Sequence, residues 1–166
     1  MEVFTIGHSN HGPDKFLSLL KQHAITLIVD VRSKPTSRFP HFSRDNLIRL
    51  VRSNEIDYRY GGNVLGGMGN VQIDAPLFIT KMDAILTLTE EGQRVAMMCS
   101  EGKPCECHRA GKLCAWYHRH RDTVKTTHIM TDGSLVDARQ YEPKVIPEVT
   151  WFEFMSTMTG QHHLKL

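Results

Sequence analysis

The chain has 166 residues, of which 40% are hydrophobic, so one globular domain with a sizeable core is expected. No apolar run approaches the ~20 residues that a membrane helix needs, and no membrane partner is expected. The net charge of +2 is too small to indicate nucleic-acid binding by itself. The first residues lack the basic and apolar segments of a secretory signal, so we expect a cytoplasmic protein with reduced cysteines.

Short apolar runs and amphipathic stretches alternate along the chain. Residues 3–6, 26–31, 56–60, 95–99 and 124–130 are rich in β-branched and aromatic side chains and predict strands. Helical spacing follows Pro13, Ser43 and Pro76 and covers residues 107–121, with Ser43 and Asp74 as expected capping residues. This pattern predicts a single three-layer α/β domain over residues 1–166, with helices on both faces of a mainly parallel sheet of about five strands. Trp151, Phe152 and Phe154 are expected to clasp its core.

Four polar loops follow predicted strands, at residues 8–10, 30–38, 61–70 and 99–109. Ligands of parallel sheets bind outside the carboxyl ends of the strands, so we expect the four loops to border one cleft. The third loop holds five glycines and is interpreted as a flexible flap, with an ordinary surface loop as the alternative.

Three of the four cysteines lie in the fourth loop. Cys107 opens a predicted helix beside His108 and Arg109, where the helix dipole and the guanidinium group both favour a thiolate. Cys99 ends a strand and could be the nucleophile itself or a resolving partner of Cys107. The alternative for both is burial in the core, where free cysteine is common.

The other two cysteines receive different interpretations. Cys114 shares a helical face with Ala110, Leu113 and Tyr117 and is expected in the core. Cys105 lies between Pro104 and Glu106 and is expected to be exposed. No cofactor is predicted. Zinc is a secondary possibility, for which the soft ligands would be Cys99, Cys105, Cys107 and His108, with His8 as a further one.

An anion site is expected in the same cleft. Arg32, Arg38 and Arg109 offer planar forks of donors that suit phosphate, and Asp30 could hold one of them in place. A surface network of ion pairs is the alternative. His8 could act as a general base or cap the turn at Gly7. A second basic cluster, residues 118–121, could contact a nucleic-acid backbone or only stabilise a helix end.

Several strings in the chain resemble a bacterial family, the domain-of-unknown-function family 488. They are Thr5-Ile6-Gly7-His8-Ser9, Asp30-Val31-Arg32-Ser33 with Pro35, Ser37-Arg38, Pro40 and Phe42, then Leu65-Gly66-Gly67, Cys99 with Glu101, and Cys107-His108-Arg109. The resemblance spans about residues 5–133 and implies a compact cytoplasmic α/β domain without implying a reaction. Its motifs select a set of candidate residues: Cys107, Cys99, His8 and Glu101 as catalytic, and Ser9, Asp30, Arg32, Ser33, Arg38, Gly66, Gly67, His108 and Arg109 as substrate-binding.

The layout of strand, cysteine loop, arginine and helix is also similar to the active-site loop of rhodanese-like sulfurtransferases and related phosphatases. Those proteins place one cysteine before a short backbone cradle that an arginine closes. Here Cys107 is two positions from Arg109 and Cys99 is ten positions from it, so neither reaction is favoured. The fold expected is therefore Rossmann-like or rhodanese-like, and the function must be argued from the residues.

Three functional hypotheses follow. The first is a cysteine-dependent transferase or hydrolase that acts on a phosphate-bearing substrate, either a nucleotide or nucleic acid. The second is a non-catalytic module that binds nucleic acid or a nucleotide. The third is a metal-binding or thiol redox protein. An anionic small molecule or nucleic acid is the expected partner, and the oligomeric state is not predicted.

Overall fold

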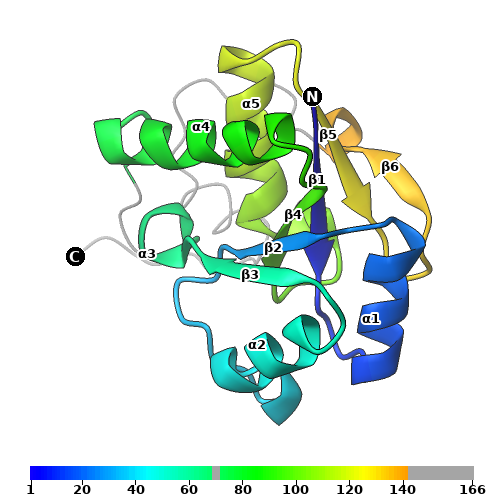
Figure 1. The fold of residues 1–166 in the computed structure, drawn as a ribbon. Helices are drawn as coiled ribbons and strands as arrows, with labels where there is room; N and C mark the ends of the chain where they lie inside the picture. The colour runs from blue at the N-terminus through cyan, green and yellow to red at the C-terminus, as the bar shows by residue number, and fades with distance from the viewer. Residues whose placement is uncertain (69–71, 142–166) are drawn as a thin grey trace, which may run out of the picture.

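A computed structural model describes residues 1–68 and 72–141 and contains one six-stranded sheet (Figure 1). Its strands are β1 (Glu2–Gly7), β2 (Leu27–Asp30), β3 (Asp57–Tyr60), β4 (Val95–Cys99), β5 (Lys125–Ile129) and β6 (Leu135–Asp137). Their order in the sheet is β3-β2-β4-β1-β5-β6, and only β6 runs antiparallel to its neighbour. The mainly parallel α/β fold is thus confirmed, and β6 is a strand that was not predicted.

The helices are α1 (Pro13–Gln22), α2 (Arg44–Arg52), α3 (Gly62–Leu65), α4 (Pro76–Glu90) and α5 (Ala115–His120). A π-helical segment, Arg109–Cys114, leads directly into α5, so the helix predicted over residues 107–121 has two parts. Short 3₁₀ turns occupy Pro40–Phe42, Pro104–Glu106 and Ala138–Tyr141. The first part of the glycine-rich run forms α3, where a flexible flap or an ordinary surface loop was expected.

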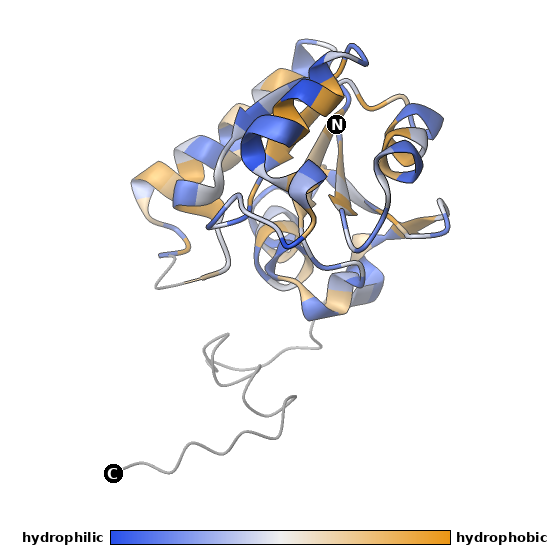
Figure 2. Ribbon diagram, turned by 90° about the horizontal axis from the view of Figure 1, so that it is seen from below, coloured by the Kyte–Doolittle hydropathy of each residue, from blue (hydrophilic) through white to orange (hydrophobic). Residues whose placement is uncertain are grey.

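The helices cover both faces of the sheet. α1 and α2 pack on one face, and α3, α4 and α5 pack on the other (Figure 1). Successive strand residues point to opposite faces, so Leu27 and Val29 join one core cluster while Ile28 joins the other. Hydrophobic and hydrophilic residues alternate along the helices accordingly (Figure 2). The predicted three layers are confirmed.

The sheet topology creates a crevice at the carboxyl ends of β2 and β4. These strands are neighbours, but the chain leaves β2 toward α2 on one face and leaves β4 toward α5 on the other. Such a divergence opens a crevice where α/β proteins bind ligands. The parallel register of β1 with β4 aligns Gly7 with Cys99, which brings the loop after β1 against the base of this crevice.

Neither Ser43 nor Asp74 forms the side-chain cap that the sequence predicts. Ser43 occupies the N-cap of α2, but its side chain makes no capping hydrogen bond. Asp74 accepts a hydrogen bond from the Trp116 indole N–H at 2.6 Å and does not cap α4. The proposed clasp of Trp151, Phe152 and Phe154 lies outside the described residues. Within residues 1–68 and 72–141, no helix combines the length and apolar character needed to cross a bilayer.

Candidate active site

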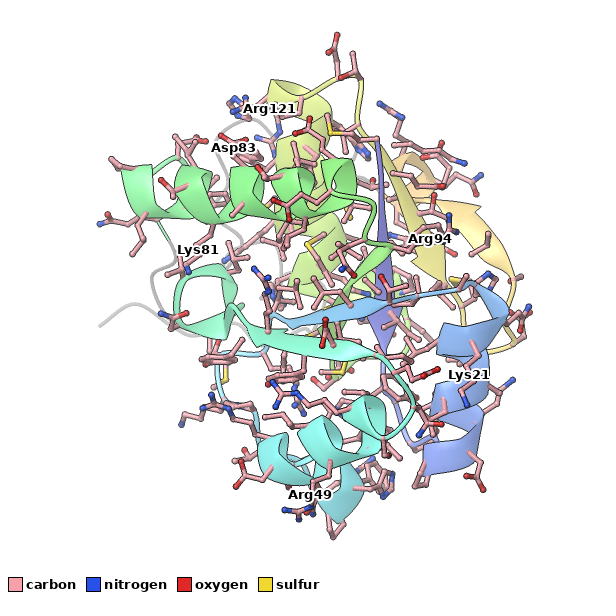
Figure 3. The ribbon with its side chains drawn as sticks, viewed as in Figure 1. Lys21, Arg49, Lys81, Asp83, Arg94 and Arg121 are labelled. Carbon is pink, nitrogen blue, oxygen red and sulfur yellow. The ribbon has the colours of Figure 1, made fainter. Side chains whose placement is uncertain are left out.

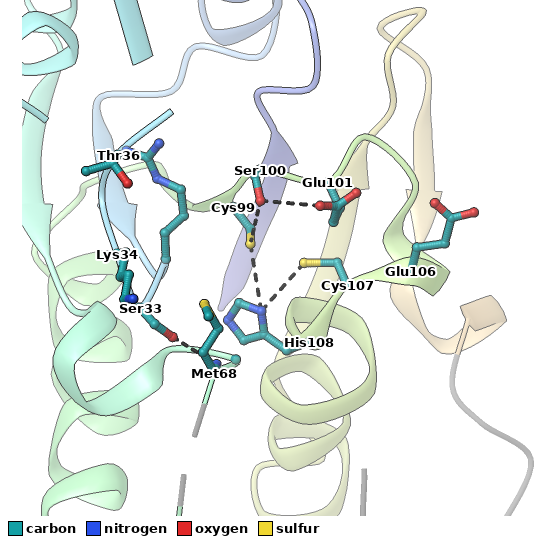
Figure 4. Close-up of a pocket in the computed structure, with 12 residues that line it drawn as sticks. Ser33, Lys34, Thr36, Met68, Cys99, Ser100, Glu101, Glu106, Cys107 and His108 are labelled. Atoms are coloured by element: carbon teal, nitrogen blue, oxygen red, sulfur yellow. Dashed lines mark hydrogen bonds between the residues drawn. The ribbon is translucent and has the colours of Figure 1, made fainter. Parts of the chain in front are cut away.

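A cavity of about 290 Å³ occupies the crevice, and three of the four predicted loops border it (Figure 4). The loop after β2, the loop after β3 and the loop after β4 each supply part of its wall. Its lining residues are Arg32, Ser33, Lys34, Thr36, Gly67, Met68, Cys99, Ser100, Glu101, Glu106, Cys107 and His108. The cavity has the size of a small-molecule site.

Two thiols meet one imidazole ring at this cavity. His108 Nδ1 lies 3.7 Å from the Cys99 sulfur and 3.7 Å from the Cys107 sulfur. Figure 4 shows both sulfur atoms facing the same side of the ring. All three side chains are buried, yet all three border the cavity. The predicted partners Cys99 and Cys107 therefore lie close together in space, and His108 contacts both of them.

The surroundings of Cys99 favour its thiolate. The pKa of the Cys99 thiol is lowered far below its ordinary value, mainly because the Cys107 thiol donates a hydrogen bond to it. Burial opposes this shift, while a hydrogen bond from His108 and the positive charges of His108 and Arg109 add to it. The pKa of Cys107 is raised, because Cys107 gives its proton to the hydrogen bond with Cys99 and because it is buried. Of the two cysteines, Cys99 is therefore the one whose surroundings lower the thiol pKa, and Cys107 is the one whose surroundings raise it.

The glycine pair at the end of α3 allows close packing around this cluster. A Cβ atom on Gly67 would lie 2.7 Å from His108 Cγ and Nδ1, and one on Gly66 would lie 2.2 Å from Ser33 Oγ. The Ser33 hydroxyl in turn accepts a hydrogen bond from the Met68 N–H at 2.9 Å. The backbone after β3 thus rests on the His108 ring and on the loop after β2. Both glycines act by their small size.

Arg109 is hydrogen-bonded to the backbone of the loop after β4. Its side chain is fully buried, and its guanidinium donates hydrogen bonds to the carbonyl oxygens of Glu101 and Gly102. It therefore does not face the cavity, contrary to the expectation that it binds an anion there. It still contributes positive charge near Cys99, and it fixes the loop that carries the thiolate.

Arg32 lines the cavity but is held by protein groups. Its Nε and Nη2 atoms donate to the two carboxylate oxygens of Asp30 at 2.9 and 2.6 Å, and Nη1 donates to the Phe42 carbonyl at 2.9 Å. The Tyr58 hydroxyl also donates to Asp30, at 2.8 Å. This confirms that Asp30 holds an arginine in place. The expected trio of anion-binding guanidinium groups is not formed.

His8 is a buried residue whose ring contacts Arg32. Its Nδ1 lies 2.8 Å from the Ser9 carbonyl, its Nε2 lies 3.4 Å from Arg32 Nη1, and its ring stacks on Phe42. Burial lowers the pKa of His8 to about 4, and Arg32 adds to that effect, so the ring is neutral at pH 7. Both ring nitrogens have protein partners. The geometry therefore does not support His8 as a general base, and His108 is the histidine beside the sulfur.

Of the remaining candidate residues, Glu101 lines the cavity, whereas Ser9 and Arg38 lie outside it. Ser9 is outside the cavity wall, with its hydroxyl on Asn10. Arg38 is exposed and stacks over Phe39, so it also lies outside. Glu101 borders the cavity as an exposed carboxylate. Cys105 is exposed and Cys114 is buried, as predicted.

Four polar residues of the wall, Lys34, Thr36, Ser100 and Glu106, were not among the predicted site residues. Lys34 and Thr36 are exposed residues of the loop after β2, which had been identified as a cleft loop. Their side-chain types, an ammonium and a hydroxyl beside Ser33, were the available signal. His108 was predicted as a substrate-binding residue and as a possible zinc ligand with the cysteines, and not as the acid or base beside a thiol.

Two of the four residues of the second basic cluster, His120 and Arg121, contact acidic residues. Arg121 forms two hydrogen bonds with Asp83 of α4, at 3.1 and 2.9 Å, and the two residues lie side by side in Figure 3. His120 lies 3.6 Å from Asp74 and stacks on Trp116. These pairings fit a helix end that packs on α4 better than a bare surface for nucleic acid.

Comparison with known proteins yields one family. Residues 12–74 match the model of the family described as Domain of unknown function DUF488. The predicted resemblance to DUF488 is confirmed over this segment. It includes α1, the loop that carries Arg32, and the glycine pair beside His108, but it ends before the cysteine loop. No significant match was found among curated proteins or among solved structures.

Among residues 1–68 and 72–141, Cys99, Cys107 and His108 also form a group that could hold a metal ion. One ligand atom from each lies within 4.8 Å of the other two. Cys105 and His8, which were considered with them, are not part of this group.

Proposed function

We propose that this protein is a cysteine-dependent enzyme whose nucleophile is the Cys99 thiolate. The observation that carries the proposal is the position of the Cys99 sulfur, at the wall of a cavity and 3.7 Å from a histidine nitrogen. A cysteine nucleophile needs a thiolate, an adjacent acid or base, and access for a substrate. Cys107 and Arg109 supply the field for the thiolate, and His108 supplies the acid or base.

The reaction that these groups support is a displacement by sulfur. The Cys99 sulfur attacks an electrophilic carbon or phosphorus atom, and the bond from that atom to its leaving group breaks. His108 Nδ1 lies beside the sulfur, so its proton can pass to the leaving group. A water molecule or a second substrate then displaces the sulfur and returns a proton to Nδ1. The enzyme is a hydrolase or a transferase according to which of these attacks.

The side of the cavity that the loop after β2 forms favours a small substrate with an anionic group, whereas the exposed carboxylates of Glu101 and Glu106 line the wall that the loop after β4 forms. Ser33, Lys34 and Thr36 form a polar side, on which Lys34 is exposed and the Ser33 hydroxyl proton has no protein acceptor among the described residues. These groups suit phosphate through one ammonium and two hydroxyls. A volume of about 290 Å³ suits a mononucleotide better than a polymer. We therefore favour a nucleotide over nucleic acid as the substrate.

Site-resolved alkylation tests the proposal. Chelator-treated protein would be reacted with iodoacetamide at about pH 6, and the modified peptides identified by mass spectrometry. Cys99 is expected to react before Cys105, which is the exposed thiol and serves as an internal control. Adenosine monophosphate should slow the reaction at Cys99 but not at Cys105, and Lys34→Ala should remove that protection. If Cys105 reacts first and Cys99 stays unmodified, Cys99 is not a nucleophile.

A further inference from the structure

The geometry points to a site for one thiophilic divalent cation, such as Zn²⁺, formed by the two sulfurs of Cys99 and Cys107 and by His108 Nδ1. The site shares its residues with the proposed nucleophile but does not depend on that function. When the cation is bound, both thiols have lost their protons to the solvent and their sulfur lone pairs are engaged. Bound cation and nucleophilic Cys99 are then mutually exclusive states of the protein.

The distances fit a tetrahedral ion. Zinc lies about 2.3 Å from sulfur and about 2.0–2.1 Å from imidazole nitrogen, which at tetrahedral angles separates sulfur from nitrogen by about 3.6 Å and sulfur from sulfur by about 3.8 Å. The two observed sulfur–nitrogen distances are both 3.7 Å, and all three ligand atoms lie within 4.8 Å of one another. The three side chains could therefore bind the ion with little movement.

The surroundings favour one class of ion. Two sulfurs and one imidazole are soft or borderline ligands, which select zinc or a similar transition metal over magnesium and calcium. All three residues are buried, and the rest of the loop is held by Arg109, so the ligands are preorganised. Three protein ligands at the wall of a cavity leave a fourth position for water or a ligand atom, as in catalytic zinc sites.

One nitrogen of His108 is placed to act as the ligand atom. His108 Nε2 is buried and has no hydrogen-bond partner among the described residues. Only Nδ1 is directed toward other polar side chains, and these are the two thiols. The ring therefore offers Nδ1 as the ligand atom, while Nε2 lacks, among the described residues, the outer-shell acceptor that metal-bound histidines usually have.

Cobalt titration tests the site directly. Stripped protein would be titrated with Co²⁺, whose charge-transfer absorption in the near ultraviolet reports thiolate ligands, and Zn²⁺ would then be used to displace it. We expect one equivalent to bind. Cys107→Ser should reduce the band and weaken Zn²⁺ binding by more than the roughly tenfold to hundredfold that loss of an outer-shell partner costs. Cys105→Ser and Cys114→Ser are matched controls and should bind as the unchanged protein does.

A second measurement needs no variant, so it holds even if a substitution harms folding. One equivalent of Zn²⁺ should block alkylation of Cys99 in the unchanged protein and leave Cys105 reactive, and chelator should restore the reaction. Absence of a cobalt band together with absence of zinc protection would overturn the cation site. So would a band that disappears in Cys105→Ser. Rapid alkylation of Cys99 in stripped protein would still support the proposed function in that case, so the two proposals can fail separately.

Discussion

At the scale of single residues, the site depends on which side-chain atoms the fold brings into contact. The sequence predicted Cys99 and Cys107 as partners, and both sulfurs lie near His108 Nδ1, because Cys99 ends β4 and Cys107 lies in the loop that follows it. It could not predict the directions of the arginines. The guanidinium of Arg109 is bonded to backbone carbonyls, whose positions depend on how the loop after β4 folds. For the same reason, His8 was preferred to His108 as the acid or base.

A small residue beside His108 offers the first prediction. Gly67→Ala should lower the alkylation rate of Cys99 by about tenfold or more, because a methyl group 2.7 Å from the ring must displace Nδ1 from the sulfur. The rate would be measured by site-resolved mass spectrometry. Gly12→Ala is the control, since a Cβ atom there meets nothing within 4 Å. An unchanged rate in Gly67→Ala, with the fold intact by circular dichroism, would show that the ring position does not govern Cys99.

At the scale of elements, the five parallel strands and the main helices could be predicted, because each carries its own periodic apolar pattern. Three elements lacked such a signal. β6 has only three residues at a sheet edge, α3 has four residues in a glycine-rich run, and the π-helical segment Arg109–Cys114 differs from an α-helix only in its hydrogen-bond spacing. The last of these lies directly after His108, at the site itself.

The loop after β2 provides a prediction at this scale. Arg32→Ala should lower the free energy of unfolding by about 3–5 kcal/mol, because it leaves the fully buried Asp30 carboxylate without its cation. Urea denaturation monitored by circular dichroism would measure it. Arg38→Ala, from the same loop, should change stability by less than about 0.5 kcal/mol, because Arg38 is exposed. Equal effects of the two substitutions would contradict the assignment of Arg32 to the structural ion pair.

At the scale of the whole molecule, the order of strands explains why distant segments meet. β2 and β4 are neighbours although more than sixty residues separate them along the chain, and their loops leave for opposite faces. The expectation that strand-end loops would converge is borne out for the loops after β2, β3 and β4. The loop after β1 instead supports the base of the site, since the His8 N–H donates to the Cys99 carbonyl at 2.9 Å.

Two buried histidines predict how the stability of the molecule depends on pH. Burial lowers the pKa of His128 to about 3, with Arg109 adding to the shift, and lowers that of His8 to about 4. Both bind protons in the unfolded chain at about pH 6.5 but not in the folded one. Above about pH 6.5 both histidines are neutral in the folded and in the unfolded chain, so neither lowers the free energy of unfolding. As the pH falls from about 6.5 toward 4, each should lower the free energy of unfolding by roughly 1.4 kcal/mol per pH unit.

Urea denaturation at several pH values would measure this slope. His128→Asn should retain a polar partner for the Thr5 hydroxyl, which lies 2.6 Å from His128 Nδ1, and should flatten the slope by the contribution of one histidine. A slope in His128→Asn as steep as that of the unchanged protein would show that His128 does not titrate on unfolding.

The central claim is that Cys99 is a thiolate at neutral pH, and the ultraviolet absorption of thiolates tests it most directly. Stripped protein and its Cys99→Ser variant would be titrated across the pH range in which both remain folded by circular dichroism. We expect the unchanged protein to keep one thiolate at about pH 6, far below the ordinary cysteine pKa of about 8.5, and Cys99→Ser to lose this absorption. If the two titration curves coincide up to about pH 8, Cys99 is an ordinary buried thiol and the claim is wrong.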